Sequence, residues 1–192
     1  MKKILAIAVL AISTMTIYAQ EDSKLTVNAG FGFSSVVGDD ADTKNIFSYK
    51  IGLTYDFDIT ENFYIIPGIE LVSKGCETEN IAGDISMTYL QIPVLAAYRF
   101  NLSDDLNLKI KAGPYASYGI YGSDIELYDG TEINVFDDEG GYERLDAGII
   151  AGISFDFNSF SIGAEYSRGL MKLDSDYKQY NQTYGITFGY KF

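Results

Sequence analysis

The sequence predicts an all-β fold, an antiparallel barrel of eight strands, and three observations lead to this prediction. Segments that alternate apolar with small or polar residues recur along the chain, and a period of two is that of a strand. The connections between these segments alternate short and long. Tyr (16), Phe (12) and Gly (19) are abundant while Pro (3) is scarce, as expected for aromatic strands whose backbones approach closely.

The first half of the chain contains four predicted strands, at about residues 24–37, 46–57, 62–73 and 85–100. The first two alternate cleanly, with Phe31 and Phe33 on one side of the first and Tyr49 and Ile51 on one side of the second. The third is less regular, and we expect its odd-numbered residues to face outward and Glu70 inward. The fourth is predicted to face outward through Leu90, Ile92, Val94, Ala96, Tyr98 and Phe100.

The second half contains four more predicted strands, at about residues 106–121, 143–157, 160–172 and 180–192. The last of them shows the pattern most clearly, because its outward side is uniformly aromatic or aliphatic. These residues, which we predict to face lipid, are Tyr184, Ile186, Phe188, Tyr190 and Phe192. Small or polar residues oppose them, which is typical of a strand in an outer-membrane barrel. Each predicted strand reaches the ~9–11 residues that a tilted transmembrane strand needs.

The predicted connections separate into two classes. Residues 58–61, 101–105 and 158–159 form short polar turns, whereas residues 38–45, 74–84, 122–142 and 174–179 form longer, mostly acidic loops. Outer-membrane barrels have short periplasmic turns and longer extracellular loops. The alternation therefore predicts an even-numbered transmembrane barrel with both termini on the periplasmic side.

The N-terminal segment predicts export. Two lysines are followed by an apolar run at residues 4–12, and Ala19 is a suitable last residue before cleavage. The run is too short for a spanning helix, which disfavours an uncleaved membrane anchor. We therefore expect a signal peptide at residues 1–19, a barrel domain at residues 20–192, and localisation in the cell outer membrane.

The charge of the chain limits its partners. The formal net charge is −13, and cleavage would remove Lys2 and Lys3, leaving 12 basic and 27 acidic residues, or −15. Such a chain is not expected to bind nucleic acid or anionic headgroups through a basic patch. The single cysteine, Cys76, forms no internal disulfide and is interpreted as an incidental loop residue.

A soluble lipocalin-like barrel is the main alternative fold. In that fold the apolar face would line a ligand cavity and the polar face would meet water. Here the non-apolar face is rich in glycine, serine and threonine, which suits the crowded interior of a narrow barrel better than a solvated surface. The uninterrupted apolar face would then meet lipid.

Several motifs also carry a family resemblance. Residues 89–100 (YLQIPVLAAYRF) resemble the central signature of the PorT-like outer-membrane β-barrel proteins of Bacteroidetes. Residues 111–118 (KAGPYASY), 147–152 and 165–170 (EYSRGL) resemble strands that follow it in that family. The resemblance covers essentially the whole mature chain. It implies an outer-membrane barrel and says little about function, because most members have no assigned biochemical role.

The chain contains no histidine, which excludes Ser-His-acid hydrolysis and His-ligated metal sites. We expect no enzymatic activity and no cofactor. Charged residues of both signs occur at predicted inward positions: Lys50, Glu70, Arg99, Lys109, Lys111, Asp146, Glu165 and Lys191. We interpret them as ion pairs inside a closed barrel, with a proton or ion path as the alternative.

The loop at residues 122–142 is the candidate partner-binding segment, because it interleaves acidic with apolar residues. Its candidate contact residues are Tyr128, Phe136, Asp137, Asp138 and Glu139. Calcium binding is an alternative, although the spacing matches no known calcium loop.

The sequence therefore predicts a small, non-catalytic outer-membrane barrel with a structural or interaction role in the envelope. Its expected partners are outer-membrane lipid, the barrel assembly machinery and another envelope or surface protein. A narrow pore is the alternative function.

Overall fold

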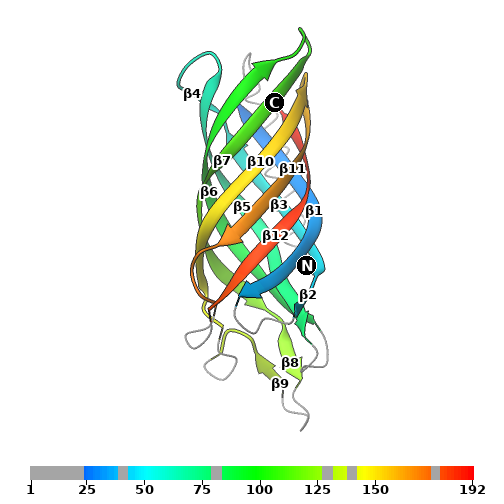
Figure 1. Ribbon diagram of the computed structural model, residues 1–192, viewed down its shortest axis with the longest axis vertical. Helices are drawn as coiled ribbons and strands as arrows, with labels where there is room; N and C mark the ends of the chain where they lie inside the picture. The colour runs from blue at the N-terminus through cyan, green and yellow to red at the C-terminus, as the bar shows by residue number, and fades with distance from the viewer. Residues whose placement is uncertain (1–23, 39–42, 79–83, 127–131, 138–141, 174–177) are drawn as a thin grey trace.

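The computed structural model describes residues 24–38, 43–78, 84–126, 132–137, 142–173 and 178–192. Eight strands form a closed antiparallel barrel (Figure 1). They are β1 (Leu25–Gly38), β3 (Ile46–Tyr55), β5 (Phe63–Thr78), β6 (Asp84–Asn101), β7 (Leu106–Gly122), β10 (Leu145–Phe157), β11 (Phe160–Gly169) and β12 (Gln179–Lys191). Each pairs with its neighbours in the chain, and β1 pairs with β12 from Thr26↔Lys191 to Gly38↔Gln179, which closes the barrel.

Four short strands accompany the barrel. β2 (Thr43–Lys44) pairs with the C-terminal end of β5, and β4 (Phe57–Asp58) pairs with its N-terminal end. β8 (Asp124–Glu126) and β9 (Glu132–Asn134) form a separate hairpin beyond the long-loop end of the barrel (Figure 1). We call this the loop end, and the opposite end, with the turns after β4, β6 and β10, the turn end.

The predicted all-β fold is confirmed, and the eight predicted strands match the eight barrel strands with shifted ends. The largest shift is in β5, which continues to Thr78 instead of ending at residue 73. Gly75 makes this continuation possible, because it has a φ of 152° and a side chain there would collide with the backbone oxygen of Ile85. Lys74 and Cys76, which were predicted to lie in a loop, are therefore buried strand residues.

The turns differ in how they reverse the chain. The connection between β10 and β11 is a two-residue turn, in which Asn158 has a φ of 49°. Asparagine tolerates this left-handed conformation better than most residues. The turn before β7 is held by backbone hydrogen bonds from Leu102 and Ser103 to the oxygen of Leu106. Short polar turns thus keep the strands in register at this end.

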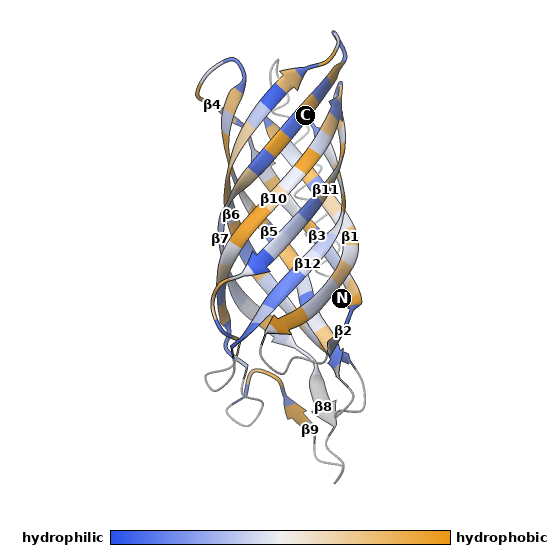
Figure 2. Ribbon diagram, in the orientation of Figure 1, coloured by the Kyte–Doolittle hydropathy of each residue, from blue (hydrophilic) through white to orange (hydrophobic). Residues whose placement is uncertain are grey.

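The two faces of the barrel wall have opposite chemistry. Large apolar side chains cover the outer face, including Tyr184, Ile186, Phe188 and Tyr190 of β12, while Phe192 is half-buried. Rings also contact each other across β1 and β12, as in the Phe31–Phe188 stack at 6.1 Å. Figure 2 shows the alternation of hydropathy along each strand. An apolar face that points outward is opposite to the lipocalin arrangement and is suited to lipid.

No helix within the described ranges is long and apolar enough to cross a membrane.

Candidate functional site

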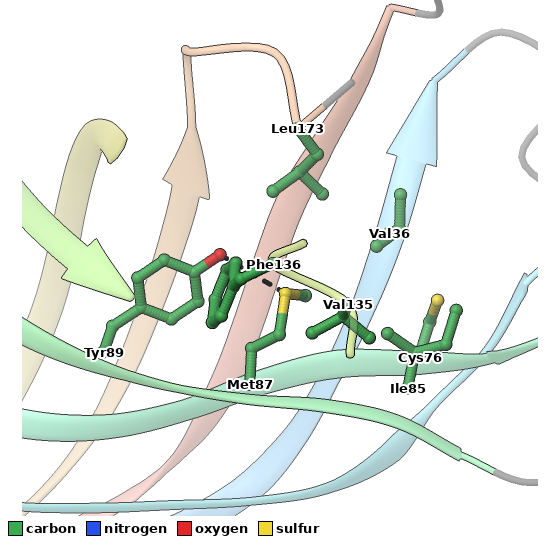
Figure 3. Close-up of a cluster of buried hydrophobic side chains, with 8 residues drawn as sticks. All are labelled: Val36, Cys76, Ile85, Met87, Tyr89, Val135, Phe136 and Leu173. Carbon is green, nitrogen blue, oxygen red and sulfur yellow. Dashed lines mark hydrogen bonds between the residues drawn. The ribbon is translucent and has the colours of Figure 1, made fainter. Parts of the chain in front are cut away.

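The loop end of the interior is filled by an apolar cluster, which we call the cap (Figure 3). Its side chains come from β1, β5 and β6 and from the connections around the β8–β9 hairpin and before β12. The members, each no more than 8% exposed, are Val36, Cys76, Ile85, Met87, Tyr89, Val135, Phe136 and Leu173. Because strands and connections contribute together, the cap couples the conformation of the loop end to the barrel wall.

Local interactions direct the end of the β8–β9 hairpin into the cap. The Asn134 side chain donates a hydrogen bond to the Gly122 oxygen at 2.9 Å and accepts one from the Phe136 backbone N–H at 3.1 Å. A Cβ atom at Gly119 would lie 2.3 Å from the Phe136 ring, and one at Gly122 would lie 2.3 Å from Val135. Glycines in β7 therefore leave the space that these two side chains occupy.

This placement corrects one prediction. Phe136 was expected to present an aromatic surface on an exposed loop, but it is buried and meets the Tyr89 ring edge-on at 6.0 Å. The reason is that a Phe ring gains more from burial in the barrel mouth than from exposure to water. Asp137, its neighbour, is exposed. Tyr128, Asp138 and Glu139 lie outside the described residues. Two of the three carboxylates on which the calcium-binding alternative depends, Asp138 and Glu139, are therefore not described.

A buried ion pair lies inside the barrel beneath the cap. The Lys74 Nζ atom is 2.8 Å from Asp146 Oδ2, and the two side chains are 0% and 1% exposed. Tyr115 and Asn181 each donate a further hydrogen bond to the same oxygen, at 3.1 and 3.2 Å. The Lys74 ammonium also lies 4.3 Å from the Tyr115 ring centroid, a cation–π distance. These contacts replace the water around Lys74 and around one oxygen of Asp146, while Asp146 Oδ1 is buried without a hydrogen-bond partner.

The same pair places a lysine beside a serine, since Lys74 Nζ lies 3.4 Å from Ser117 Oγ. A lysine that activates a serine must be able to accept its proton, and a substrate must reach the hydroxyl oxygen. Here the ammonium is held by Asp146, and Ser117 is 4% exposed beneath the cap. The geometry therefore favours a structural role for this cluster over nucleophilic catalysis.

Four of the predicted lumen residues form a network in the middle of the barrel. Lys50 bridges Glu165 and Glu70, with 3.5 Å between Lys50 Nζ and Glu70 Oε1. Lys111 contacts the other oxygen of Glu165 at 2.9 Å. Gln91 donates to Glu70 at 3.0 Å. Two lysines and two carboxylates thus balance each other across β3, β5, β7 and β11.

The turn end of the interior holds a second group of charges around a cavity that we call the vestibule. Lys109 bridges Asp56 at 3.2 Å and Asp156 at 2.9 Å, and Lys191 lies 3.6 Å from Asp56. Arg99 stacks over Tyr64, with its guanidinium carbon 4.3 Å from the ring centroid. The vestibule has a volume of about 180 Å³. All eight predicted lumen residues therefore face the interior, and seven of them form ion pairs.

Sequence reasoning missed Lys74 because it placed the residue in a loop. The signal was present, because Val72, Lys74 and Cys76 continue the inward alternation that begins at Glu70. In the residues that the structure describes, no group of three or more Cys, Asp or Glu side chains is arranged to hold a metal ion.

The comparisons with known proteins agree with this architecture. The family model described as "Outer membrane protein beta-barrel domain" matches residues 18–175. The solved structure of the outer membrane enzyme PagL is similar, with 15% identity, 87% of this chain and 99% of that chain covered, and a TM-score of 0.56. Neisserial surface protein A (NspA) is similar with 12% identity, coverage of 90% and 100%, and a TM-score of 0.59. No curated protein matches the sequence.

Proposed function

The chain belongs to the outer membrane protein beta-barrel domain family, and from that premise we propose a structural or protein-interaction role for it in the cell envelope. The observation that carries this proposal is that packed and ion-paired side chains occupy the loop end and the middle of the interior. The cap, the Lys74–Asp146 pair and the central charge network succeed one another along the barrel. An interior of this kind leaves the loop end as the surface where function resides, because loops carry function on rigid scaffolds.

The proposed orientation and location follow from the same architecture. The loop end faces the cell exterior and the turn end faces the periplasm, as in barrels of this class. The apolar outer face contacts outer-membrane lipid, and β12 is the strand on which the barrel assembly machinery acts. The N-terminal pattern at residues 1–19, which lies outside the described residues, supports export. Mass spectrometry of the mature protein is expected to find Gln20 as its first residue, whereas an intact Met1 would contradict a cleaved signal.

The proposed partner is another envelope or surface protein that binds the acidic loops. Asp137 is exposed directly beside the buried Phe136, so the cap holds this carboxylate at the loop end. Within the family, we further propose that the chain belongs with the PorT-like barrels of Bacteroidetes. The motif at residues 89–100 supports this, and it lies on β6, which supplies both Arg99 to the vestibule and Tyr89 to the cap.

Two other functions remain as rivals. PagL is described as an enzyme, but this chain has no histidine, and the contact between Lys74 and Ser117 is buried. We therefore propose a non-catalytic role.

A narrow pore would require the paired charges and the cap to separate. Planar-bilayer recording is expected to show no steady conductance, and stable single-channel steps would favour the pore.

Photo-crosslinking in intact cells tests the interaction role. A photoreactive amino acid at position 137 samples the loop end, and the same probe at the exposed Asp104 samples the turn end as a matched control. We expect a discrete crosslinked protein from position 137 that is absent from position 104. A further probe at Tyr128 extends the scan along the loop. The proposal would be contradicted if neither loop position gave a crosslinked product in protein that is folded and surface-exposed.

A further inference from the structure

The vestibule is a polar cavity of about 180 Å³, and it lies at the opposite end from the proposed partner surface. Its wall includes inward residues of most barrel strands and of the turn between β10 and β11, where Asn158 and Ser159 contribute. Ile66 and Leu95, which belong to a second buried apolar cluster, also line it. The central charge network lies further in, and two of its members, Glu70 and Lys111, also line the vestibule.

The charges that line the vestibule are unequal. Four cations face three carboxylates: Arg99, Lys109, Lys111 and Lys191 against Asp56, Glu70 and Asp156. Each carboxylate already has a lysine within 4 Å. Arg99, in contrast, has no carboxylate at ion-pair distance among the described residues, so it supplies the excess positive charge.

Arg99 also carries an unused hydrogen-bond donor. Its Nε atom is buried and has no partner in the structure. Buried donors are nearly always satisfied, because an unsatisfied one costs about 1–3 kcal/mol. The guanidinium carbon lies 4.3 Å from the centroid of the Tyr64 ring, and a guanidinium can pair with a planar or tetrahedral anion. The excess positive charge beside this guanidinium therefore points to an anion as the ligand.

The size of the cavity limits that ligand. A cavity of about 180 Å³ has room for several water molecules. A carboxylate or phosphate group fits this volume with some water, whereas a folded partner does not. Arginine pairs with both groups through charge-assisted hydrogen bonds.

We propose that the vestibule binds a small oxyanion, a carboxylate or a phosphate, which enters from the turn end and pairs with Arg99 and Lys191. Lys191 is the second contact because its side chain is 34% exposed and its distance of 3.6 Å to Asp56 is loose. In the proposed orientation, the ligand comes from the periplasm.

The side-chain Nε–H signals of the ¹⁵N-labelled barrel in zwitterionic micelles provide the test. The chain has three arginines, and Arg144 and Arg168, which lie at the loop end, are internal controls. Sodium acetate and sodium phosphate are titrated separately, against sodium chloride at equal ionic strength. We expect a saturable shift of the Arg99 signal alone, and the anion that saturates at lower concentration identifies the source.

Variants separate binding at the vestibule from a general salt effect. Lys191→Gln is expected to raise the apparent Kd at least threefold, while Lys172→Gln, an exposed cation at the loop end, leaves it unchanged. Arg99→Gln, followed at the Lys109 side chain, is expected to abolish the saturable response. If this variant does not fold, Arg99→Lys, which keeps the charge but loses the forked donors, is expected to weaken the response. An unsaturated response, equal shifts at all three arginines, or the same shift with chloride would overturn the proposal, whatever the crosslinking experiment shows.

Discussion

The two ends of the barrel interior solve the burial of charge in different ways. At the loop end, Lys74 and Asp146 are fully buried beneath an apolar cap, and each has one charged partner. At the turn end, Lys109 is shared between two carboxylates, and Lys191 keeps a third of its side chain exposed. Each charge at the loop end thus has a single charged partner and is shielded from water. At the turn end, charges share partners or keep contact with water.

This difference bears on how each end responds to change. A fully buried charge that loses its only partner has no water to replace it, so the cost is large. A charge with two partners, or with solvent beside it, loses much less. The loop end is therefore expected to be rigid and intolerant of substitution, which suits a platform for a partner. The turn end is expected to exchange one ionic contact for another, which suits a site for a small ligand.

The largest effect is expected for Asp146→Asn. This change leaves Lys74 buried without its counter-charge and should lower the free energy of unfolding by about 3–5 kcal/mol. Urea unfolding of the barrel in lipid vesicles measures it. Asp56→Asn is the matched control at the turn end and should cost clearly less than Asp146→Asn, because Lys109 keeps its contact with Asp156. Equal costs at the two ends would remove the contrast between them.

The next effect concerns the outer face rather than the interior. Phe188→Arg places a charge on the apolar side of β12 and should cost about 2–4 kcal/mol if the residue lies at the middle of the bilayer. Phe160→Arg, one outward position closer to the turn end, should cost less, because the cost of a lipid-facing charge falls toward the interface. Folding into vesicles measures both. A tolerated arginine at position 188 would contradict a lipid-facing wall.

The smallest effect is expected for Lys191→Gln. Its contact with Asp56 is partly exposed and redundant with Lys109, so the free energy of unfolding should fall by about 1 kcal/mol or less. The same urea measurement detects it. A loss of stability as large as that of Asp146→Asn would mean that charges at the turn end depend on single partners as strongly as those at the loop end.

The sequence was sufficient for the barrel wall because the period of two is a local property. Phe188 and Tyr190 could be assigned to the outer face, and Lys109 and Glu165 to the interior, from their own strands alone. The pairing of Lys50 with Glu165 could not, because it joins β3 and β11, which are not adjacent strands. Contacts across a lumen depend on side-chain length and barrel curvature, and alternation records neither.

The cap was beyond sequence reasoning for a similar reason. Val135 and Phe136 lie among acidic residues that resemble a solvated loop, and their burial depends on space left by Gly119 and Gly122 in β7. Lys74 was misplaced because loop and strand share the acidic and glycine-containing composition of that stretch. A continued alternation after Glu70 was the only local sign.

The reactivity of Cys76 tests the central claim, a cap that closes the loop end, most directly. This residue is the only cysteine, it belongs to the cap, and its exposure is 2%. In intact vesicles, a membrane-impermeant maleimide is expected to label the native protein slowly. Phe136→Ala should raise the rate at least tenfold, because loss of a buried ring typically costs about 3–5 kcal/mol and opens the cap. Rapid labelling of the native protein, or no acceleration in the folded variant, would contradict a closed loop end.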